Sequence, residues 1–349
     1  MLGLADRLRL AAVLLATQVL GACAGGAEDP LSLNAARERL DESPWVIADV
    51  GDFDGDGMWD LLWNVTGKST MSIWLMAGTD VLLPGPLIPG PPGADWHVAW
   101  AADFNGDGLS DARWDNSATQ QTAIWLMAGA ELSLPGPAFP GPLGSGWEHD
   151  GSADFNADGM ADLLWRNTTT HAAEVWLMNG TAPLLPGPVL PPPLGDGWRA
   201  EKAADFNADG MADVLWDNAA SHSVTIGLSS GTTTLLQGPT WPMPPGDGWV
   251  IVTAPDLNAD GMADVLWFNP AEHVITSWLM NGTELLLAGP VIPAPPGDGW
   301  VPVNTGDLNA DDMADVVWEH TPTSRFVVWL MAGTRVLLRG PEIPGPEGV

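Results

Sequence analysis

An aspartate-rich loop occurs six times in this chain at a constant spacing of 51 residues. The first copy runs from Asp52 to Asp60, and the later copies begin at Asp103, Asp154, Asp205, Asp256 and Asp307. Oxygen-bearing side chains stand at positions 1, 3, 5 and 9 of the loop, and Gly stands at position 6 in five of the six copies. Hard cations such as Ca²⁺ take oxygen ligands in this kind of arrangement. The spacing therefore predicts a repeating fold with one cation site in each repeat.

Five groups in each loop are the expected Ca²⁺ ligands, namely the side chains at positions 1, 3, 5 and 9 and the carbonyl oxygen of position 7. In chain order they belong to Asp52, Asp54, Asp56, Met58, Asp60, Asp103, Asn105, Asp107, Leu109, Asp111, Asp154, Asn156, Asp158, Met160, Asp162, Asp205, Asn207, Asp209, Met211, Asp213, Asp256, Asn258, Asp260, Met262, Asp264, Asp307, Asn309, Asp311, Met313 and Asp315. Carboxylates packed this closely repel one another without a cation. We therefore expect up to six Ca²⁺ ions.

Two details of the loops limit this expectation. An EF-hand would need a Glu at position 12, where the third copy has Trp165, so the EF-hand is excluded. In the sixth loop Asp312 replaces the glycine and adds a negative charge. Asp tolerates the left-handed backbone conformation at a cost of about 1 kcal/mol. Whether the sixth loop holds calcium is left open.

Each 51-residue unit has the pattern of four short strands. Residues 45–50 of the first unit, and 162–165, 174–178 and 184–185 of the third, exemplify the four strands, with Asn179-Gly180 expected to supply two positive φ angles at a hairpin turn. A proline-rich connector, residues 186–193, belongs at the outer rim. Four antiparallel strands at a period of about 50 residues predict an all-β fold, the β-propeller. The six blades are residues 45–95, 96–146, 147–197, 198–248, 249–299 and 300–349. Ring closure is expected to come from packing between the first and last units.

Three series of tryptophans repeat with the same period, beginning at Trp45, Trp63 and Trp74, and the third series is interrupted at Gly227. Large flat side chains fill the space between neighbouring blades, so we expect these series to be buried. Trp59, Trp100 and Trp241 lie outside the series and are the better candidates for exposed platforms.

The charge of the chain limits its partners. The formal net charge is −32, which argues against nucleic-acid binding through phosphate contacts. Twenty of the 44 acidic residues lie in the six loops, so the loops account for most of the obvious candidates for acid–base catalysis.

The N-terminal segment has the pattern of a lipoprotein signal. Two arginines precede an apolar run over residues 10–20 that is too short to span a bilayer, and the run ends in Leu20-Gly21-Ala22-Cys23. This resembles a bacterial lipobox, which implies a signal peptide over residues 1–22, lipidation of Cys23 and a flexible tether over residues 23–44. By analogy with lipoprotein sorting, Ala24 favours the outer membrane. The protein is then expected at the cell envelope, either periplasmic or surface-exposed, with the lipid anchor as its only contact with the membrane.

Two motifs suggest chemistry but are weak. Gly227-Leu228-Ser229-Ser230-Gly231 matches the serine-hydrolase pattern, but it occupies a strand that enters a hairpin rather than a strand-to-helix turn. His171, His222 and His273 are 51 residues apart in equivalent polar turns, where a shared metal site is less favoured than solvated side chains. We expect no catalytic site and no cofactor other than Ca²⁺.

The repeat resembles the bacterial FG-GAP/VCBS type in Asp103-Phe104-Asn105-Gly106-Asp107-Gly108 and in Trp176-Leu177-Met178-Asn179-Gly180-Thr181. The resemblance covers residues 45–349 and implies an integrin-α-like propeller with Ca²⁺ in its loops and a role in adhesion, recognition or assembly. The leading hypothesis is a monomeric, lipid-anchored, non-catalytic module that recognises a glycan or an envelope protein. The alternatives are an enzyme with its active site at the propeller channel and a purely structural envelope component.

Overall fold

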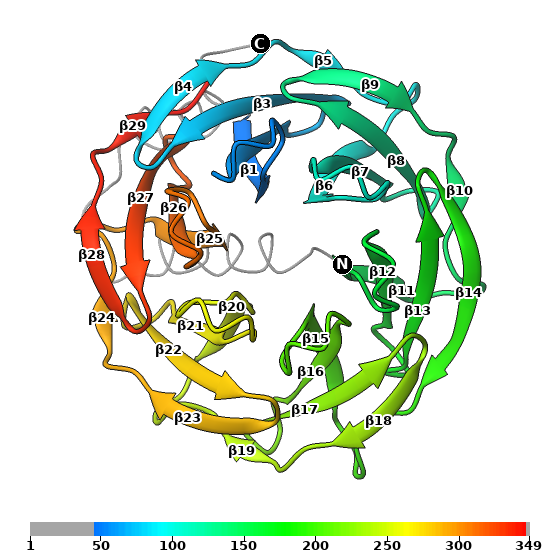
Figure 1. The fold of residues 1–349 in the computed structure, drawn as a ribbon, viewed down its shortest axis with the longest axis vertical. Coiled ribbons are helices and arrows are strands. Elements are labelled where there is room, and N and C mark those ends of the chain that lie inside the picture. The colour runs from blue at the N-terminus through cyan, green and yellow to red at the C-terminus, as the bar shows by residue number, and fades with distance from the viewer. Residues whose placement is uncertain (1–44, 347–349) are drawn as a thin grey trace, which may run out of the picture.

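A computed structural model describes residues 45–346 of the chain, and these form a ring of six antiparallel β-sheets around a central axis (Figure 1). The first strand of each sheet lies nearest the axis, and the fourth lies at the outer rim. The predicted six-bladed propeller is therefore confirmed. Residues 1–44, which carry the expected signal peptide, lipidated Cys23 and tether, lie outside the described residues. Within residues 45–346, no helix is long and apolar enough to span a membrane.

The strands follow the repeat, blade by blade. The first blade has β1 (Trp45–Gly51), β2 (Asp60–Val65), β3 (Thr70–Ala77), β4 (Asp80–Pro84) and β5 (Ile88–Pro89). The second has β6 (Trp96–Ala102), β7 (Asp111–Asn116), β8 (Gln121–Ala128), β9 (Glu131–Pro135) and β10 (Phe139–Pro140). The third has β11 (Trp147–Ala153), β12 (Asp162–Asn167), β13 (Ala173–Asn179) and β14 (Ala182–Leu190). The fourth has β15 (Arg199–Ala204), β16 (Asp213–Asn218), β17 (Ser223–Ser230), β18 (Thr233–Gln237) and β19 (Trp241–Pro242). The fifth has β20 (Val250–Thr253), β21 (Val265–Asn269), β22 (Val274–Asn281), β23 (Glu284–Ala288) and β24 (Ile292–Pro293). The sixth has β25 (Trp300–Gly306), β26 (Asp315–His320), β27 (Arg325–Ala332), β28 (Arg335–Arg339) and β29 (Ile343–Pro344).

The proline-rich connector is more regular than its sequence suggests. In five blades two of its residues pair with the start of the third strand, as β5 does with Thr70 and Met71 of β3. In the third blade β14 runs from Ala182 to Leu190 and makes both pairings itself. Proline is compatible with this place because the segment lies at the edge of its sheet.

The hairpin turn in the third blade differs from the predicted one by one residue. Asn179 pairs with Ala182 in the ladder between β13 and β14, so the turn consists of Gly180 and Thr181. Gly180 has a φ of 61°, whereas Asn179 is not among the residues with positive φ. The prediction of two positive φ angles at Asn179-Gly180 was wrong, because Gly at the first central position is enough for a two-residue turn.

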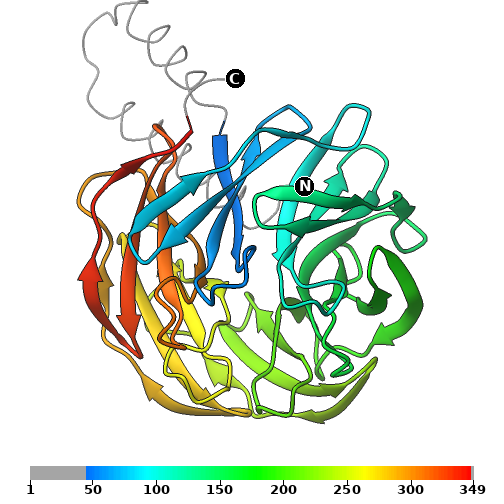
Figure 2. The ribbon, with the colours of Figure 1, turned by 45° about the horizontal axis from the view of Figure 1, so that its top comes forward.

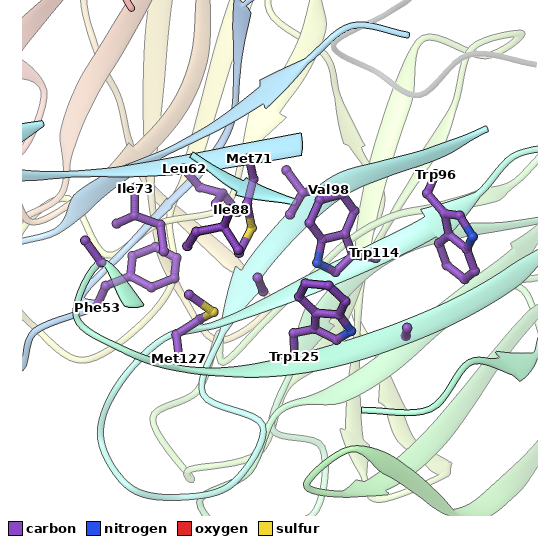
Figure 3. Packing of buried hydrophobic residues seen from close by; sticks show 13 residues of the cluster. Phe53, Leu62, Met71, Ile73, Ile88, Trp96, Val98, Trp114, Trp125 and Met127 are labelled. Carbon is purple, nitrogen blue, oxygen red and sulfur yellow. The ribbon is translucent and has the colours of Figure 1, made fainter. Parts of the chain in front are cut away.

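The hydrophobic core lies between blades rather than inside any single blade. Figure 3 shows the cluster between the first two blades, where Phe53, Leu62 and Ile73 from one blade meet Val98 and Trp114 from the next. A sheet of only a few strands cannot bury both faces alone, so each blade depends on its neighbours.

The tryptophan series fill these interfaces, as predicted. All six members of the Trp63 series are buried, with exposed fractions between 0 and 4%. Five of them pair with a tryptophan of the Trp74 series at centroid distances of 5.0–5.5 Å. In the fourth blade Gly227 takes the place of that partner, and the Gln237 side chain lies beside it and bonds Thr225.

The ring is closed by the same contact that joins all the other neighbouring blades. The carbonyl oxygen at loop position 1 accepts a hydrogen bond from the amide at position 8 of the next loop, at 2.6–2.8 Å in all six interfaces. The carbonyl at position 2 accepts a second hydrogen bond from the hairpin glycine of the next blade, at 2.7–3.0 Å. Trp59 and Gly78 of the first blade bond Asp307 and Leu308 of the sixth in this way, so the first and last blades lie side by side (Figure 2). Trp63 of the first blade also packs against Phe326 of the sixth, so the expected closure by packing is confirmed and these backbone bonds reinforce it.

Removing one interface tryptophan tests this description of the core. We expect Trp267→Ala to lower the free energy of unfolding by about 3–5 kcal/mol, because the indole is completely buried between two blades. Leu286→Ala is the control, since Leu286 is 57% exposed on β23 and its loss should change stability by less than about 0.5 kcal/mol. Chemical denaturation followed by fluorescence measures both, and equal midpoints for the two variants would contradict the description.

Candidate functional site

The six aspartate loops connect the first and second strands of each blade and lie at one end of the ring. Their neighbours there are the hairpin turns between third and fourth strands, as the hydrogen bonds between blades show. The polar turns between second and third strands lie at the opposite end, beside the proline-rich connectors, where Gly141 donates to the Gln120 carbonyl. The sequence thus distributes its loops over two chemically different faces.

The side chain at position 1 organises the front of each loop. In the first loop the two carboxylate oxygens of Asp52 accept hydrogen bonds from the amides of Gly55 and Gly57, at 2.7 and 3.0 Å. The chain can turn around this carboxylate because positions 4 and 6 adopt positive φ, 78° at Gly55 and 85° at Gly57. Four of the loops hold the position 4 conformation with Ala, at φ between 57° and 59°. Short-range hydrogen bonds to aspartate thus compensate for a backbone conformation that alanine rarely adopts.

The side chain at position 9 is buried and ties the loop to the sheet. In the first loop Asp60 is 1% exposed, and its Oδ2 accepts from the Phe53 amide at 3.0 Å while its Oδ1 accepts from the Met76 amide on β3 at 2.9 Å. The same two bonds recur in the other five loops at 2.8–3.2 Å. The position 9 aspartate therefore fixes the loop at the point where its carbonyl groups contact the next blade.

Burial makes these carboxyls weak acids when no cation is present. It raises the pKa of Asp60 to about 7, against the lowering effect of the two backbone hydrogen bonds, and the nearby charges of Asp54 and Asp52 raise it further. The pKa of every other position 9 aspartate is likewise about 7, for Asp111, Asp162, Asp213, Asp264 and Asp315. A bound cation would favour the ionised form of the same groups.

The loops present oxygen atoms in a geometry that suits a cation. Among residues 45–346, one group of three potential metal-ligating residues of the His, Cys, Asp or Glu types converges, and it consists of Asp52, Asp54 and Asp60 with ligand atoms within 4.8 Å of one another. The other five loops have Asn at position 3, so an amide oxygen takes the place of one carboxylate. In the sixth loop the buried Oδ1 of Asn309 has no hydrogen-bond partner among the described residues. Carboxylate and amide oxygens are the donors that a hard divalent cation requires, so the residues present fit such an ion.

The sixth loop keeps the common conformation despite Asp312. This residue has a φ of 64°, and its amide donates to Asp307 Oδ2 at 2.7 Å, as the glycine does in the other loops. The substitution therefore changes the charge and the strain of the loop, not its path.

The other residues predicted as candidates, which are three tryptophans, three histidines and one serine, lie in different surroundings. Trp59 is 37% exposed and Trp100 is half-buried, and both line a cavity at the centre of the ring. The Trp241 indole instead donates a hydrogen bond to the Thr283 carbonyl at the outer rim. His171, His222 and His273 adopt positive φ in their turns and form no converging metal-ligand group in the described part of the chain. Ser229 is completely buried in β17, which agrees with an accidental match to the hydrolase pattern.

Sequence reasoning missed a group of charged residues near the axis, in the second to fourth blades. The buried Arg113 donates to Asp115 at 2.8 Å and lies 2.6 Å from His149 Nδ1, and burial lowers the pKa of His149 well below its usual value. Arg166 and Arg199 pair with Glu201 in the same region. A signal was present, because Arg113 stands where the other units have Leu or Val.

Comparison with known proteins agrees with this geometry. The family of FG-GAP-like repeats matches residues 48–112, 154–216 and 256–318, and each match contains two of the aspartate loops. The three matches cover more than half of the chain. The chain belongs to the FG-GAP-like repeat family. No curated protein is significantly similar to it in sequence.

Solved structures resemble this FG-GAP protein in fold. A protein from Lactobacillus plantarum superposes with a TM-score of 0.55 at 13% identity, over 85% of each chain. A protein from Bacteroides uniformis, named as a candidate 6-phosphogluconolactonase, has a TM-score of 0.52 at 12% identity, again over 85% of each chain. One from Bacteroides fragilis with the same designation has a TM-score of 0.50 at 12% identity, over 86% of this chain and 85% of its own. Identities this low show a common fold alone.

A pair of amide substitutions separates the roles of positions 5 and 9. We expect Asp264→Asn to lower stability by about 1–3 kcal/mol even without divalent cations, because the amide nitrogen cannot accept one of the two buried backbone N–H groups. Asp260→Asn is the matched control, since its loop position is exposed and the Met262 amide can still bond the remaining oxygen. Thermal unfolding in the presence of a chelator measures the stability of both variants. Equal losses of stability would contradict the anchoring role of position 9.

The raised pKa values predict an unusual pH dependence without divalent cations. The folded position 9 carboxyls have pKa values of about 7 against 3.8 in the unfolded chain, so the folded state holds more protons between these values. Their contribution to stability is complete below about pH 4 and is lost as the pH rises through 7. We expect the melting temperature in chelator to rise on acidification from pH 8 to pH 5.5, and the lowered pKa of the buried His149 opposes part of this rise. A fall in melting temperature over this range would contradict the assignment.

Proposed function

We propose that this FG-GAP protein is a calcium-stabilised, non-catalytic propeller that recognises a glycan or a protein at the bacterial cell envelope. The observation that carries the calcium part is the convergence of Asp52, Asp54 and Asp60 in a loop whose hydrogen bonds recur in all six blades. The recognition part rests on the repeated scaffold and its variable turns.

Calcium is the cation that the loops favour by their chemistry. The donors are carboxylate, amide and carbonyl oxygens, without any His or Cys, and a flexible oxygen-rich loop suits Ca²⁺ better than the strictly octahedral Mg²⁺. The side chains of positions 1, 3, 5 and 9 would hold the ion together with the position 7 carbonyl. When bound, the ion neutralises carboxylates that otherwise repel one another, next to the backbone bonds that join the blades.

Recognition fits the way the repeat varies. The loops are nearly identical, whereas the polar turns at the opposite end differ between units, as in Gly67-Lys68-Ser69 and Pro322-Thr323-Ser324. Variable turns on a rigid scaffold are where binding residues often lie. Six similar units can also offer several weak sites at once and so gain avidity. The envelope location rests on the sequence around Cys23, outside the described residues.

Calcium is expected to stabilise the protein strongly. With a Kd of about 0.1 mM and about 1 mM free Ca²⁺, each occupied loop contributes about 1.4 kcal/mol, and six contribute about 8 kcal/mol. This is comparable with the whole stability of an ordinary domain, so the melting temperature should rise by many degrees between chelator and Ca²⁺. The gain should be larger at pH 8 than at pH 5.5, because protonated position 9 carboxyls compete with the ion. Mg²⁺ is the control, and identical melting curves in calcium and chelator would refute the calcium sites.

A glycan array tests recognition directly. The purified protein is applied with Ca²⁺ and with chelator, and bound glycans are then incubated with the protein and analysed for turnover. We expect calcium-dependent binding and unchanged glycans. Conversion of a bound glycan would favour the enzymatic alternative, and calcium-dependent stability without any ligand would favour a purely structural role.

A further inference from the structure

The centre of the ring holds a cavity of about 640 Å³, and the first, fifth and sixth aspartate loops contribute only part of its lining. Its lining comes largely from the innermost strands of the blades, which surround the axis in Figure 1, together with residues of neighbouring strands and loops. Its volume lies within the range of small-molecule sites in proteins, about 300–1,000 Å³.

Six equivalent residues form a ring around this cavity, one from each blade. Each is the third residue before its aspartate loop, and each follows a β-bulge in the innermost strand. They are Asp49, Trp100, Gly151, Lys202, Thr253 and Asn304, and all six line the cavity. We call this set the axial ring.

The chemistry of the axial ring does not repeat, although the backbone that carries it does. The loops a few residues later have Asp at position 1 six times, whereas the axial ring has a carboxyl, an indole, a bare backbone, an ammonium, a hydroxyl and an amide. A set of different polar groups converging on one cavity is the usual composition of a specific ligand site.

Lys202 is the cation of this ring, and no described carboxylate pairs with it. The residue is 9% exposed, and its ammonium lies over the Trp100 ring at 5.7 Å from the centroid. The arginines near the axis differ, because Arg113 is paired with Asp115, and Arg166 and Arg199 with Glu201. A buried cation without a counter-ion favours an anionic group beside it.

Asp49 compensates for Lys202 only in part. One of its oxygens accepts the Val50 amide and a donor from Asn304, and the other accepts the Ala101 amide at 2.7 Å. Burial raises the pKa of Asp49 to about 7, so at neutral pH it carries only part of a negative charge. Within the axial ring Lys202 therefore lacks a full counter-charge. Other carboxylates also line the cavity: Asp115 and Glu148 pair with Arg113 and Arg166, Asp256 and Asp307 are expected Ca²⁺ ligands, and Asp312 adds a further negative charge.

We propose that the axial cavity binds a carboxylate-bearing monosaccharide, with its carboxylate at Lys202 and its hydroxyl groups at Asn304 and Thr253. Trp59, which is 37% exposed and lines the same cavity, offers an apolar face for the sugar ring. Gly151, in the blade next to that of Lys202, leaves room in the cavity, since a Cβ atom there would meet only Ala203 atoms, at 3.9 Å. This inference deepens the proposed recognition function, on which it rests, by giving the class of glycan and the place where it binds.

Titration calorimetry of the full chain in Ca²⁺ tests the site with three probes: galacturonic acid, N-acetylneuraminic acid and neutral galactose. We expect at least one acidic sugar to bind more tightly than galactose. Lys202→Gln should weaken that binding at least about tenfold, as the loss of a hydrogen bond to a charged group does. Lys202→Arg should retain most of it, because the positive charge remains.

Two further variants control for folding and for charge. Gly151→Leu keeps Lys202 but fills the cavity, so it should also weaken binding, while its melting temperature in Ca²⁺ stays close to that of the parent. Arg335→Gln removes one exposed positive charge on the outer strand β28 and should leave binding unchanged. Each variant is compared only after its melting curve shows a folded protein.

Several results would overturn the axial site. Among them are equal binding of galactose and the acidic sugars, unchanged affinity in Lys202→Gln and Gly151→Leu, and no binding of either acid. If the glycan array gives ligands that bind equally well to Lys202→Gln and Gly151→Leu, the axial site is wrong while the recognition function stands. If no glycan binds to any form of the protein, both proposals for glycan binding fail.

Discussion

Backbone hydrogen bonds between neighbouring aspartate loops hold the blades in one ring, and they require every loop to keep the same conformation. The position 9 aspartate binds the loop to its own sheet through two hydrogen bonds. This holds the carbonyl groups of positions 1 and 2 against the next blade. The first and last blades meet through the same pair of bonds, from Trp59 and Gly78 to Asp307 and Leu308. A distorted loop would therefore weaken both the blade that carries it and the contact with the neighbour.

The carboxylates that shape the loops also repel one another. Asp52, Asp54 and Asp60 converge within 4.8 Å, and burial raises the pKa of Asp60 to about 7. A carboxyl in that condition either takes up a proton or needs a cation. This choice is the physical basis of the proposed dependence on calcium, because the ion would neutralise the groups on which the joints between blades rest.

The parts of the molecule that repeat six times differ in role from the part whose chemistry does not repeat. The loops, the interface tryptophans and the joints between blades repeat six times, since each blade meets an equivalent packing requirement. The axial ring repeats in backbone but differs in chemistry, from Asp49 to Lys202 to Asn304. Packing does not require six different groups at equivalent positions, so the axis is the place where a single asymmetric ligand would be recognised.

The sequence alone determined the number of blades, the order of strands and the places of the loops and buried tryptophans, because these depend on a period and on hydrophobic patterns that are visible along the chain. It erred by one residue at the Gly180 turn, where a single positive φ angle was enough. It also could not show that Asp49, Trp100 and Lys202, which are 51 or more residues apart, face one cavity. Only the tertiary structure decided this, because closing the ring brings six distant strands around one axis and a bulge in each strand sets the direction of these side chains.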